Sequence, residues 1–526
     1  MTYRIESLMS ARLFMHPQYV QGRIYFLSNL SGRISLYAMN YGGSVPEPLL
    51  PPHLALQNPD LIGGQAFFVF PQLGKILVMI DHDGDENYQP MLIPLEGGFP
   101  EPAFDNFFAN YRVHLGECDR ENGIVYLSAE RRDKPLNEAY RGDLRKNKLT
   151  KLDESMYGAH PSAHSEDHKR VLIGEGYTVG DNVLFLLEGK KKKVMYGKPL
   201  DQRAPGEDVP LNGLGSSVLT PSGRGILVTT SVFEDTFSLG YIALDAPGNM
   251  QPVRLKGVVH TGVGEMEGVF HLKDDRYGVL FNIDGCSWLY EGVFDEDKLT
   301  MKLKRVVVGD APLEGGVIEH VDYDKEEDIF TVSFCTATSP TQIYTVEGKK
   351  RDTIVFHTNE KVLGIPEDLL SPGEDASFTS HDGLRVSARL YLPAPKLGFS
   401  GPRPVVYYIH GGPQSQERPN FAWFSMPLIQ FLTLRGFAVF VPNVRGSTGY
   451  GLSYTKKVDR DWGGQDRLDH VYAMTEVLPK DKRLDVSRAA VVGRSYGGYM
   501  TLTLAGRHPE LWKAQCDMFG PYDLLT

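Results

Sequence analysis

The sequence predicts a β-propeller of about seven blades followed by a parallel α/β sheet with helices on both faces. Two observations predict this division. A strand-rich repeat of about 50 residues fills the first two-thirds of the chain, and alternating strand-like and helix-like segments fill the rest. With 526 residues the chain is also too long for one ordinary hydrophobic core, so at least two domains are expected.

The repeat consists of runs of β-branched and aromatic residues, each followed by a turn and a second short strand. Successive runs begin 47 to 55 residues apart, near Ile24, Ile76, Ile124, Val171, Ile226, Val279 and Phe330. A period of this length without amphipathic helices is typical of propeller blades. A large β-sandwich is the alternative, but sandwiches do not repeat at a fixed period. We therefore assign residues 1–360 to a propeller domain.

Composition changes after the seventh repeat. Residues 361–375 contain Pro366, Pro372 and Gly373 and are predicted to form a linker, and a hairpin is expected around Asp382-Gly383. From there to the end, continuous apolar strands alternate with helix-like stretches, which indicates a parallel sheet buried on both faces. Residues 376–526 are therefore predicted to be a second domain, of the α/β-hydrolase pattern and incomplete.

One motif in the second domain predicts chemistry. Ser495 stands between Gly493 and Gly497, directly after the apolar run Ala489–Val492 and before a helix-like stretch. This G-x-S-x-G pattern between strand and helix is a nucleophile elbow, in which a strained turn presents the serine oxygen at the edge of the sheet. We predict that Ser495 is the nucleophile of an acyl-transfer reaction.

A serine nucleophile needs hydrogen-bond donors for the oxyanion that forms during attack. The backbone N–H of Tyr496 is the expected first donor, and the loop Gly411-Gly412 is expected to supply the second, most directly from Gly412. His410 precedes these glycines at a strand end, so we interpret it as a residue that shapes the loop and not as the general base.

The acid and the base of a catalytic triad are harder to find. In this fold both follow the serine in the chain, yet only 31 residues follow Ser495. His508 lies 13 residues further along the same predicted helix, about 20 Å away at 1.5 Å per residue, and is out of reach. Asp517 and Asp523 are expected in the next strand and its loop, in structural roles.

Several segments together resemble the prolyl oligopeptidase family of serine peptidases, especially its acylaminoacyl-peptidase and dipeptidyl-peptidase-like branch. They are HGGPQSQ, NVRGSTGYG, DWGGQD, GRSYGGYM and HPELWKAQCDMFGPYDLL, preceded by the repeat domain. The resemblance implies a hydrolase of short peptides whose propeller caps the active site. It also implies that the family's aspartate and histidine lie downstream of these residues, so we expect a C-terminally truncated and inactive chain.

The resemblance suggests a further role for paired acidic residues, which in dipeptidyl members bind the amino terminus of the substrate. Glu265 with Glu267, and Glu326 with Glu327, are candidates, although neither pair lies in a matching motif. Exopeptidase and endopeptidase activity both stay open. So do two other functions: a carboxylesterase, and a propeller that binds peptide without turnover.

Composition sets the remaining expectations. The net charge of −11 argues against nucleic-acid and anionic-membrane surfaces. The four scattered cysteines form no C-x-x-C pair, and three of them, Cys286, Cys335 and Cys516, lie in apolar stretches. We expect these three to be buried free thiols in a cytoplasmic protein. No cofactor and no metal are predicted, and an exposed sheet edge would favour a homo-oligomer.

Overall fold

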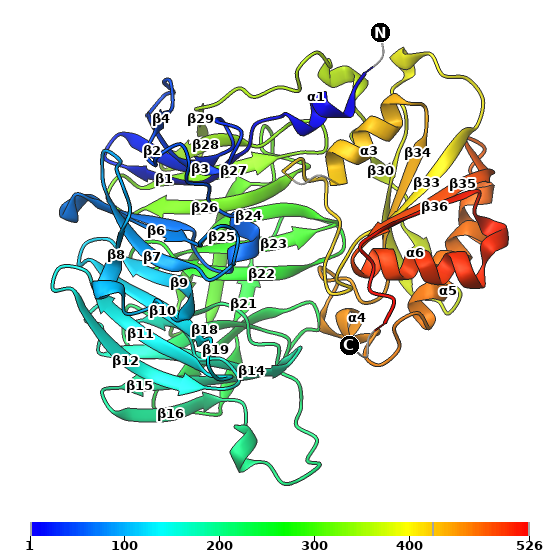
Figure 1. Ribbon diagram of the computed structural model, residues 1–526. Helices are drawn as coiled ribbons and strands as arrows, with labels where there is room; N and C mark the ends of the chain where they lie inside the picture. The colour runs from blue at the N-terminus through cyan, green and yellow to red at the C-terminus, as the bar shows by residue number, and fades with distance from the viewer. Residues whose placement is uncertain (1–2, 423–424, 524–526) are drawn as a thin grey trace.

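The computed structural model describes residues 3–422 and 425–523. Seven separate sheets follow one another along the chain up to Phe356, and one open seven-stranded sheet forms the second domain (Figure 1). The predicted seven-bladed propeller followed by an α/β domain is therefore confirmed.

Each blade is an antiparallel sheet of strands that are consecutive in the chain. Blade 1 contains β1 (Phe14–Val20), β2 (Arg23–Ser28), β3 (Ser35–Asn40) and β4 (Glu47–Pro48). Blade 2 contains β5 (Phe67–Phe70), β6 (Lys75–Ile80), β7 (Gln89–Pro94) and β8 (Glu101–Pro102), and the short helix α2 (Pro59–Ile62) precedes it. Blade 3 contains β9 (Tyr111–Asp119), β10 (Ile124–Arg131), β11 (Asn137–Asp143) and β12 (Lys148–Ser155).

The remaining blades continue this pattern. Blade 4 contains β13 (His160–His164), β14 (Arg170–Thr178), β15 (Asp181–Glu188) and β16 (Lys191–Tyr196). Blade 5 contains β17 (Ser217–Leu219), β18 (Gly225–Thr230), β19 (Ser238–Ala243) and β20 (Met250–Pro252). Blade 6 contains β22 (Gly264–His271), β23 (Arg276–Ile283), β24 (Cys286–Asp295) and β25 (Thr300–Val308), with β21 (Arg254–Lys256) added in parallel to β25. Blade 7 contains β26 (Val317–Asp324), β27 (Ile329–Cys335), β28 (Gln342–Glu347) and β29 (Thr353–Phe356).

The runs seen in the sequence are the second strands of the seven blades. In β18 and β27 every residue is buried, because the second strand packs between two neighbouring blades on both of its faces. The first strands contact one another around the axis, as β13 does with β9 and β17. Some of them carry polar residues, such as His16 and Gln18 of β1, and these do not stand out in the sequence as apolar runs.

Side-chain contacts close the ring between blade 7 and blade 1, since no strand is exchanged between them. His16 of blade 1 stacks on His320 of blade 7, with ring centroids 4.4 Å apart. Gly42 N–H donates to His357 Nδ1 at 3.1 Å, and Thr345 Oγ1 lies 3.0 Å from Nε2 of the same ring. Burial lowers the pKa of His16 and of His357 to about 4, so both rings are neutral at pH 7.

The second domain has the strand order β30-β32-β34-β33-β35-β36, and β31 pairs with β32. Its strands are β30 (Glu374–Asp375), β31 (Phe378–Thr379), β32 (Arg385–Tyr391), β33 (Arg403–Ile409), β34 (Ala438–Asn443), β35 (Leu484–Arg494) and β36 (Ala514–Met518). Its helices are α3 (Ser425–Leu434), α4 (Leu452–Lys456), α5 (Gln465–Tyr472), continued by a π turn over Ala473–Val477, and α6 (Tyr496–Arg507). The predicted hairpin around Asp382-Gly383 is the β31–β32 pair.

Both faces of this sheet are covered. Along β33, Val405, Tyr407 and Ile409 belong to a core that includes Met500 and Leu504 of α6, whereas Val406 and Tyr408 belong to the opposite core with α3. The helix α1 (Ile5–Met9) joins this second core through Leu8 and packs on α3, so the start of the chain contacts the second domain (Figure 1).

The expectation about the cysteines needs a correction. All four are free and Cys335 is buried, but Cys286 is only partly buried and Cys516 is exposed. Cys516 lies in β36, which pairs with β35 on one side and forms the edge of the sheet. An apolar sequence context therefore did not ensure burial, because burial of a sheet strand also depends on its neighbours.

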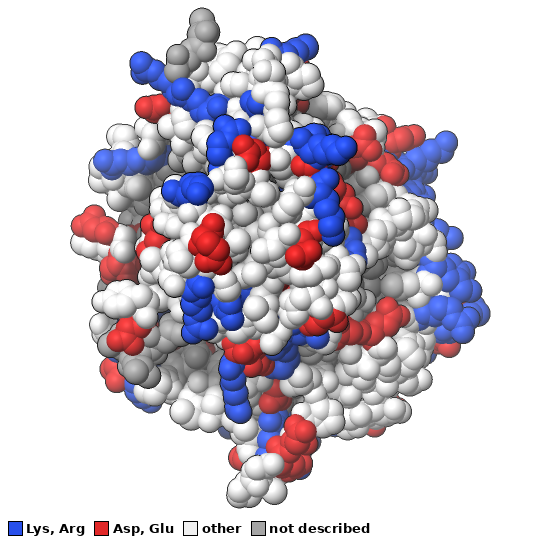
Figure 2. Space-filling view, turned by 90° about the vertical axis from the view of Figure 1, so that its right-hand side faces the viewer, with Lys and Arg blue, Asp and Glu red and all other residues white. Residues whose placement is uncertain are grey.

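None of the described helices is long and apolar enough to cross a membrane. On the face shown in Figure 2, acidic and basic side chains lie interspersed. The cytoplasmic location, the homo-oligomer and the lack of nucleic-acid binding stay predictions.

The closure of the ring should make stability depend on pH. The pKa of His357 is about 4 in the folded protein and 6.5 in the unfolded chain, so protonation favours the unfolded chain as the pH falls through this window. Lowering the pH from 7 to 5 should cost about 2 kcal/mol of unfolding free energy at this residue. Urea unfolding at both pH values checks this: His357→Gln should reduce the pH effect, and the exposed His53→Gln should leave it unchanged.

Candidate active site

The predicted elbow is present at the junction of β35 and α6. Ser495 lies between the last residue of the strand and the first of the helix, with φ 53° and ψ −121°. A non-glycine residue at positive φ is uncommon, and this ψ lies well away from the left-handed helical region, so the backbone here is strained. The surrounding packing must hold Ser495 in this conformation.

The flanking glycines show how the packing does so. A Cβ atom on Gly493 would lie 2.2 Å from the carbonyl oxygen of Gly497, and one on Gly497 would lie 2.1 Å from that of Ile409. Backbone atoms cannot yield as flexible side chains do, so both positions need glycine. The close approach of backbone segments, which the motif predicts, is therefore also what requires glycine at both positions in the structure.

The glycine loop after β33 lies beside the serine, as predicted. A Cβ built on Gly411 would be 3.3 Å from Ser495 Cβ and 3.8 Å from Ser495 Oγ. Gly412 has φ 120°, a conformation that side chains rarely allow. Tyr496 is the first residue of α6, so its backbone N–H has no acceptor within the helix and is available to a ligand. The structure thus brings Ser495, Gly411 and the start of α6 together.

His410 stabilises this loop. Its Nδ1 lies 2.6 Å from the carbonyl oxygen of Gly411 and its Nε2 lies 2.9 Å from Ser447 Oγ. Burial lowers the pKa of His410 to about 4, so the ring is neutral at pH 7. Both ring nitrogens are engaged within the loop region, which supports the loop-shaping interpretation over a role as general base.

The side chain of Tyr496 has partners that sequence reasoning missed. Its hydroxyl donates to Asp466 of α5, and its ring contacts Trp462 edge-on with centroids 4.9 Å apart. Burial raises the pKa of Asp466 to about 6. These contacts anchor the residue whose N–H is the predicted oxyanion donor. The only signal in the sequence was the segment DWGGQD, which contains both partners.

The triad acid and base are not found next to the serine. His508 lies just past the end of α6, where its Nε2 contacts Arg467 and its Nδ1 faces Glu510. Asp517 lies in β36, as predicted, and accepts a hydrogen bond from Gly520 N–H at 2.8 Å. Among the residues that the structure describes, no histidine hydrogen-bonds to the Ser495 hydroxyl.

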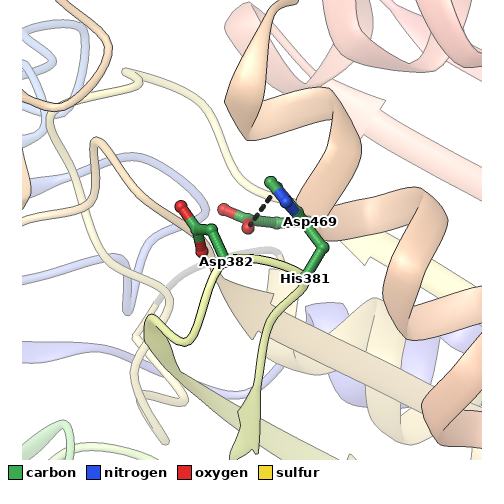
Figure 3. A group of neighbouring side chains, drawn as sticks. All are labelled: His381, Asp382 and Asp469. Carbon is green, nitrogen blue, oxygen red and sulfur yellow. Dashed lines mark ion pairs between the residues drawn. The ribbon is translucent and has the colours of Figure 1, made fainter.

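A separate cluster brings His381, Asp382 and Asp469 together (Figure 3). Arg445 lies among these carboxylates, with its Nε 2.7 Å from Asp469 Oδ2 and its Nη1 3.0 Å from Asp382 Oδ2. Its Nη2 donates to the other oxygen of Asp469, which is fully buried. The guanidinium pairs with both carboxylates, so we interpret the cluster as an ion-pair network that ties the β31–β32 hairpin to α5.

The acidic pair Glu265 and Glu267 lies between the domains. Glu265 accepts a hydrogen bond from Gly451 N–H at 2.8 Å, and Glu267 pairs with Arg418 at 3.1 Å. Both carboxylates therefore contact the second domain. The backbone N–H groups of Glu326 and Glu327 donate to Asp324, and both residues are exposed in the turn between β26 and β27. Neither arrangement supports a clamp on a substrate amino terminus.

Comparison with known proteins finds a family match in the second domain. A model described as "Prolyl oligopeptidase family" matches residues 422–526. The match covers the elbow, α6 and β36, which are the elements that carry the predicted nucleophile.

Curated proteins that are similar to part of this chain include peptidases. The chain is 30% identical over 195 residues to the "Uncharacterized peptidase YuxL" of Bacillus subtilis, covering 37% of this chain and 29% of that protein. It is 28% identical over 197 residues to the human acylamino-acid-releasing enzyme, covering 36% of this chain and 26% of that protein. The matched stretch thus spans less than a third of each of these relatives.

Solved structures match over both domains. A puromycin-hydrolyzing peptidase from Mycobacterium tuberculosis has a TM-score of 0.75 at 16% identity, covering 99% of this chain and 79% of that one. The acylaminoacyl peptidase of Pyrococcus horikoshii has a TM-score of 0.66 at 14% identity, with the same coverage. At this level of identity the likeness shows the fold alone: a propeller joined to an α/β domain.

The elbow should tolerate no side chain at Gly497. Gly497→Ala should cost at least about 3 kcal/mol of stability, because its Cβ would clash with the Ile409 and His410 carbonyl oxygens. Gly506→Ala, in the same helix, has no atom within 4 Å of its new Cβ and should stabilise by about 0.5–1 kcal/mol. Thermal and urea unfolding check both variants, and equal stability of the two would contradict the packing argument.

Proposed function

We propose that this protein is a serine peptidase that hydrolyses short peptides, with Ser495 as the nucleophile. The observation that carries the proposal is the strained backbone of Ser495 beside the Gly411-Gly412 loop. The serine oxygen attacks the peptide carbonyl carbon, and the carbonyl oxygen becomes an oxyanion next to the backbone N–H groups of Tyr496 and Gly412. Collapse of this intermediate expels the amine and leaves an acyl-enzyme, which water hydrolyses.

The proton of Ser495 needs an acceptor in this mechanism. The described residues place no histidine in hydrogen-bond contact with Ser495, and His410 is engaged within its loop. A serine without its base keeps only a small residual activity. We therefore propose that these 526 residues expressed alone react poorly. The same observation favours a second candidate function, a propeller that binds peptide without turnover.

The nucleophile can be tested with a fluorophosphonate probe and intact-mass analysis. The protein isolated from its source should gain one label, located on Ser495 by peptide mapping. Ser495→Ala should abolish labelling and reduce peptide hydrolysis by about 10⁶-fold. Ser487→Ala, an exposed serine of the same strand, is the matched control and should label normally. Labelling of Ser495→Ala at another residue would show that the nucleophile is assigned wrongly.

The same probe tests whether the base is missing. The 526-residue chain expressed alone should not label stoichiometrically at Ser495, and full labelling would refute that expectation. Activity on N-acylaminoacyl and aminoacyl amides, measured beside p-nitrophenyl esters, separates a peptidase from a carboxylesterase. Hydrolysis of esters alone would overturn the peptidase assignment, and tight peptide binding without turnover would favour the second candidate.

A further inference from the structure

We propose that the propeller holds the oxyanion loop in position, and that Arg418 is the positioning residue that couples the two. This inference rests on the proposed function, because it concerns the loop that serves Ser495. In this arrangement the propeller is part of the scaffold of the active site. The evidence lies in the segment that continues the Gly411-Gly412 loop toward α3.

Three side chains of this segment contact the propeller. Gln416 accepts a hydrogen bond from Asn282 of blade 6 at 2.6 Å. Asn420 accepts one from Cys335 of blade 7 at 3.3 Å, and its amide donates to Glu319 of the same blade. Arg418, between these two, also reaches blade 6. The even-numbered residues from 416 to 420 thus form one row of contacts to the propeller.

Arg418 makes the largest number of these contacts. Its Nε donates to the carbonyl oxygen of Gly285 at 2.9 Å, its Nη2 donates to Ser287 Oγ at 3.0 Å, and its Nη1 pairs with Glu267 at 3.1 Å. The side chain is only 18% exposed, so solvent screens these interactions little. A planar guanidinium with three fixed partners determines the position of its own backbone more strictly than one contact would.

Glu417 anchors the same segment on the opposite side. Its backbone N–H donates to Asn443 Oδ1 at 2.9 Å, and its carbonyl oxygen accepts from Asn443 Nδ2 at 3.1 Å. Its carboxyl group accepts from Ser425 Oγ at 2.7 Å, and burial raises its pKa to about 7. The segment is therefore held between β34 and α3 on one side and blade 6 on the other.

A second loop braces the same region. Ser447 contacts His410, and Thr448 N–H donates to the carbonyl oxygen of Ser415 at 3.0 Å. A few residues later this loop itself docks on the propeller, where Gly451 N–H donates to Glu265 and Leu452 N–H donates to the carbonyl oxygen of Asp235. Both loops that border the Gly411-Gly412 turn are thus attached to the propeller.

The connection between Gly412 and Arg418 is short, so the attachment of Arg418 to the propeller should affect the position of the Gly412 N–H. Only five residues separate Gly412 from Arg418, and two of them, Ser415 and Gln416, are hydrogen-bonded to the second loop. Oxyanion donors act only at the correct distance, and displacements of about 1 Å are costly to catalysis. Loss of the Arg418 contacts should therefore loosen the loop and move the donor of Gly412.

Hydrogen–deuterium exchange of the 526-residue chain tests the coupling without any need for activity. Arg418→Ala should raise the exchange rate of amides in residues 410–416 about tenfold, as expected from losing one hydrogen bond to a charged group. Arg385→Ala is the matched control, because Arg385 also pairs with the propeller, at Asp284, but lies in β32 outside this loop. It should leave exchange in residues 410–416 unchanged. Unchanged exchange in Arg418→Ala, or an equal rise in both variants, would overturn the proposal.

The second readout is the kinetics of peptide hydrolysis and probe labelling, compared between the wild-type protein and its Arg418 variants. Arg418→Ala should lower kcat and the rate of fluorophosphonate labelling about tenfold with KM nearly unchanged, and Arg418→Lys should restore part of the loss. Wild-type rates in Arg418→Ala would overturn the inference alone. Absence of labelling in the wild type would instead count against Ser495 as nucleophile, and the exchange experiment would still decide the coupling.

Discussion

The close contact of three backbone segments, β33, β35 and the start of α6, is the constraint on which the site depends. Gly493 and Gly497 allow these segments to approach so closely that a single Cβ atom would meet a carbonyl oxygen near 2 Å. The strained conformation of Ser495 is the consequence, because the chain must turn from strand to helix within that space. The packing energy of the two cores that flank the sheet offsets the strain.

The same contact brings the Gly411-Gly412 loop to the serine, since Ile409 and His410 directly precede that loop. The loop then continues into contacts with blades 6 and 7, so its geometry depends on both domains. A propeller gives a rigid surface for such contacts, because its blades are built from antiparallel sheets packed side by side around an axis. Rigid support for groups that stabilise an oxyanion is a general requirement of such sites.

Several buried ionisable groups of the second domain are shifted toward their neutral forms. Burial lowers the pKa of His410 to about 4 and that of His470 to about 3, and raises that of Glu417 to about 7. Charged groups are costly in such a dry environment unless they are paired, as Asp469 is with Arg445. The backbone N–H groups that we propose as donors to an oxyanion at Ser495 carry dipoles whose effect is strong where the dielectric constant is low.

The sequence by itself determined the seven repeats, the two domains, the elbow and the glycine loop, because each depends on local pattern: apolar second strands, strand–helix alternation and glycines at fixed spacing. It missed first strands that carry polar residues, such as β1, and the exposure of Cys516, which follows from the place of β36 at the edge of the described sheet. Only the tertiary structure showed that Asp466 holds Tyr496 and that Arg418 meets Glu267, 151 residues away in the chain. Such pairings carry no local signal, because they arise when two separately folded surfaces meet.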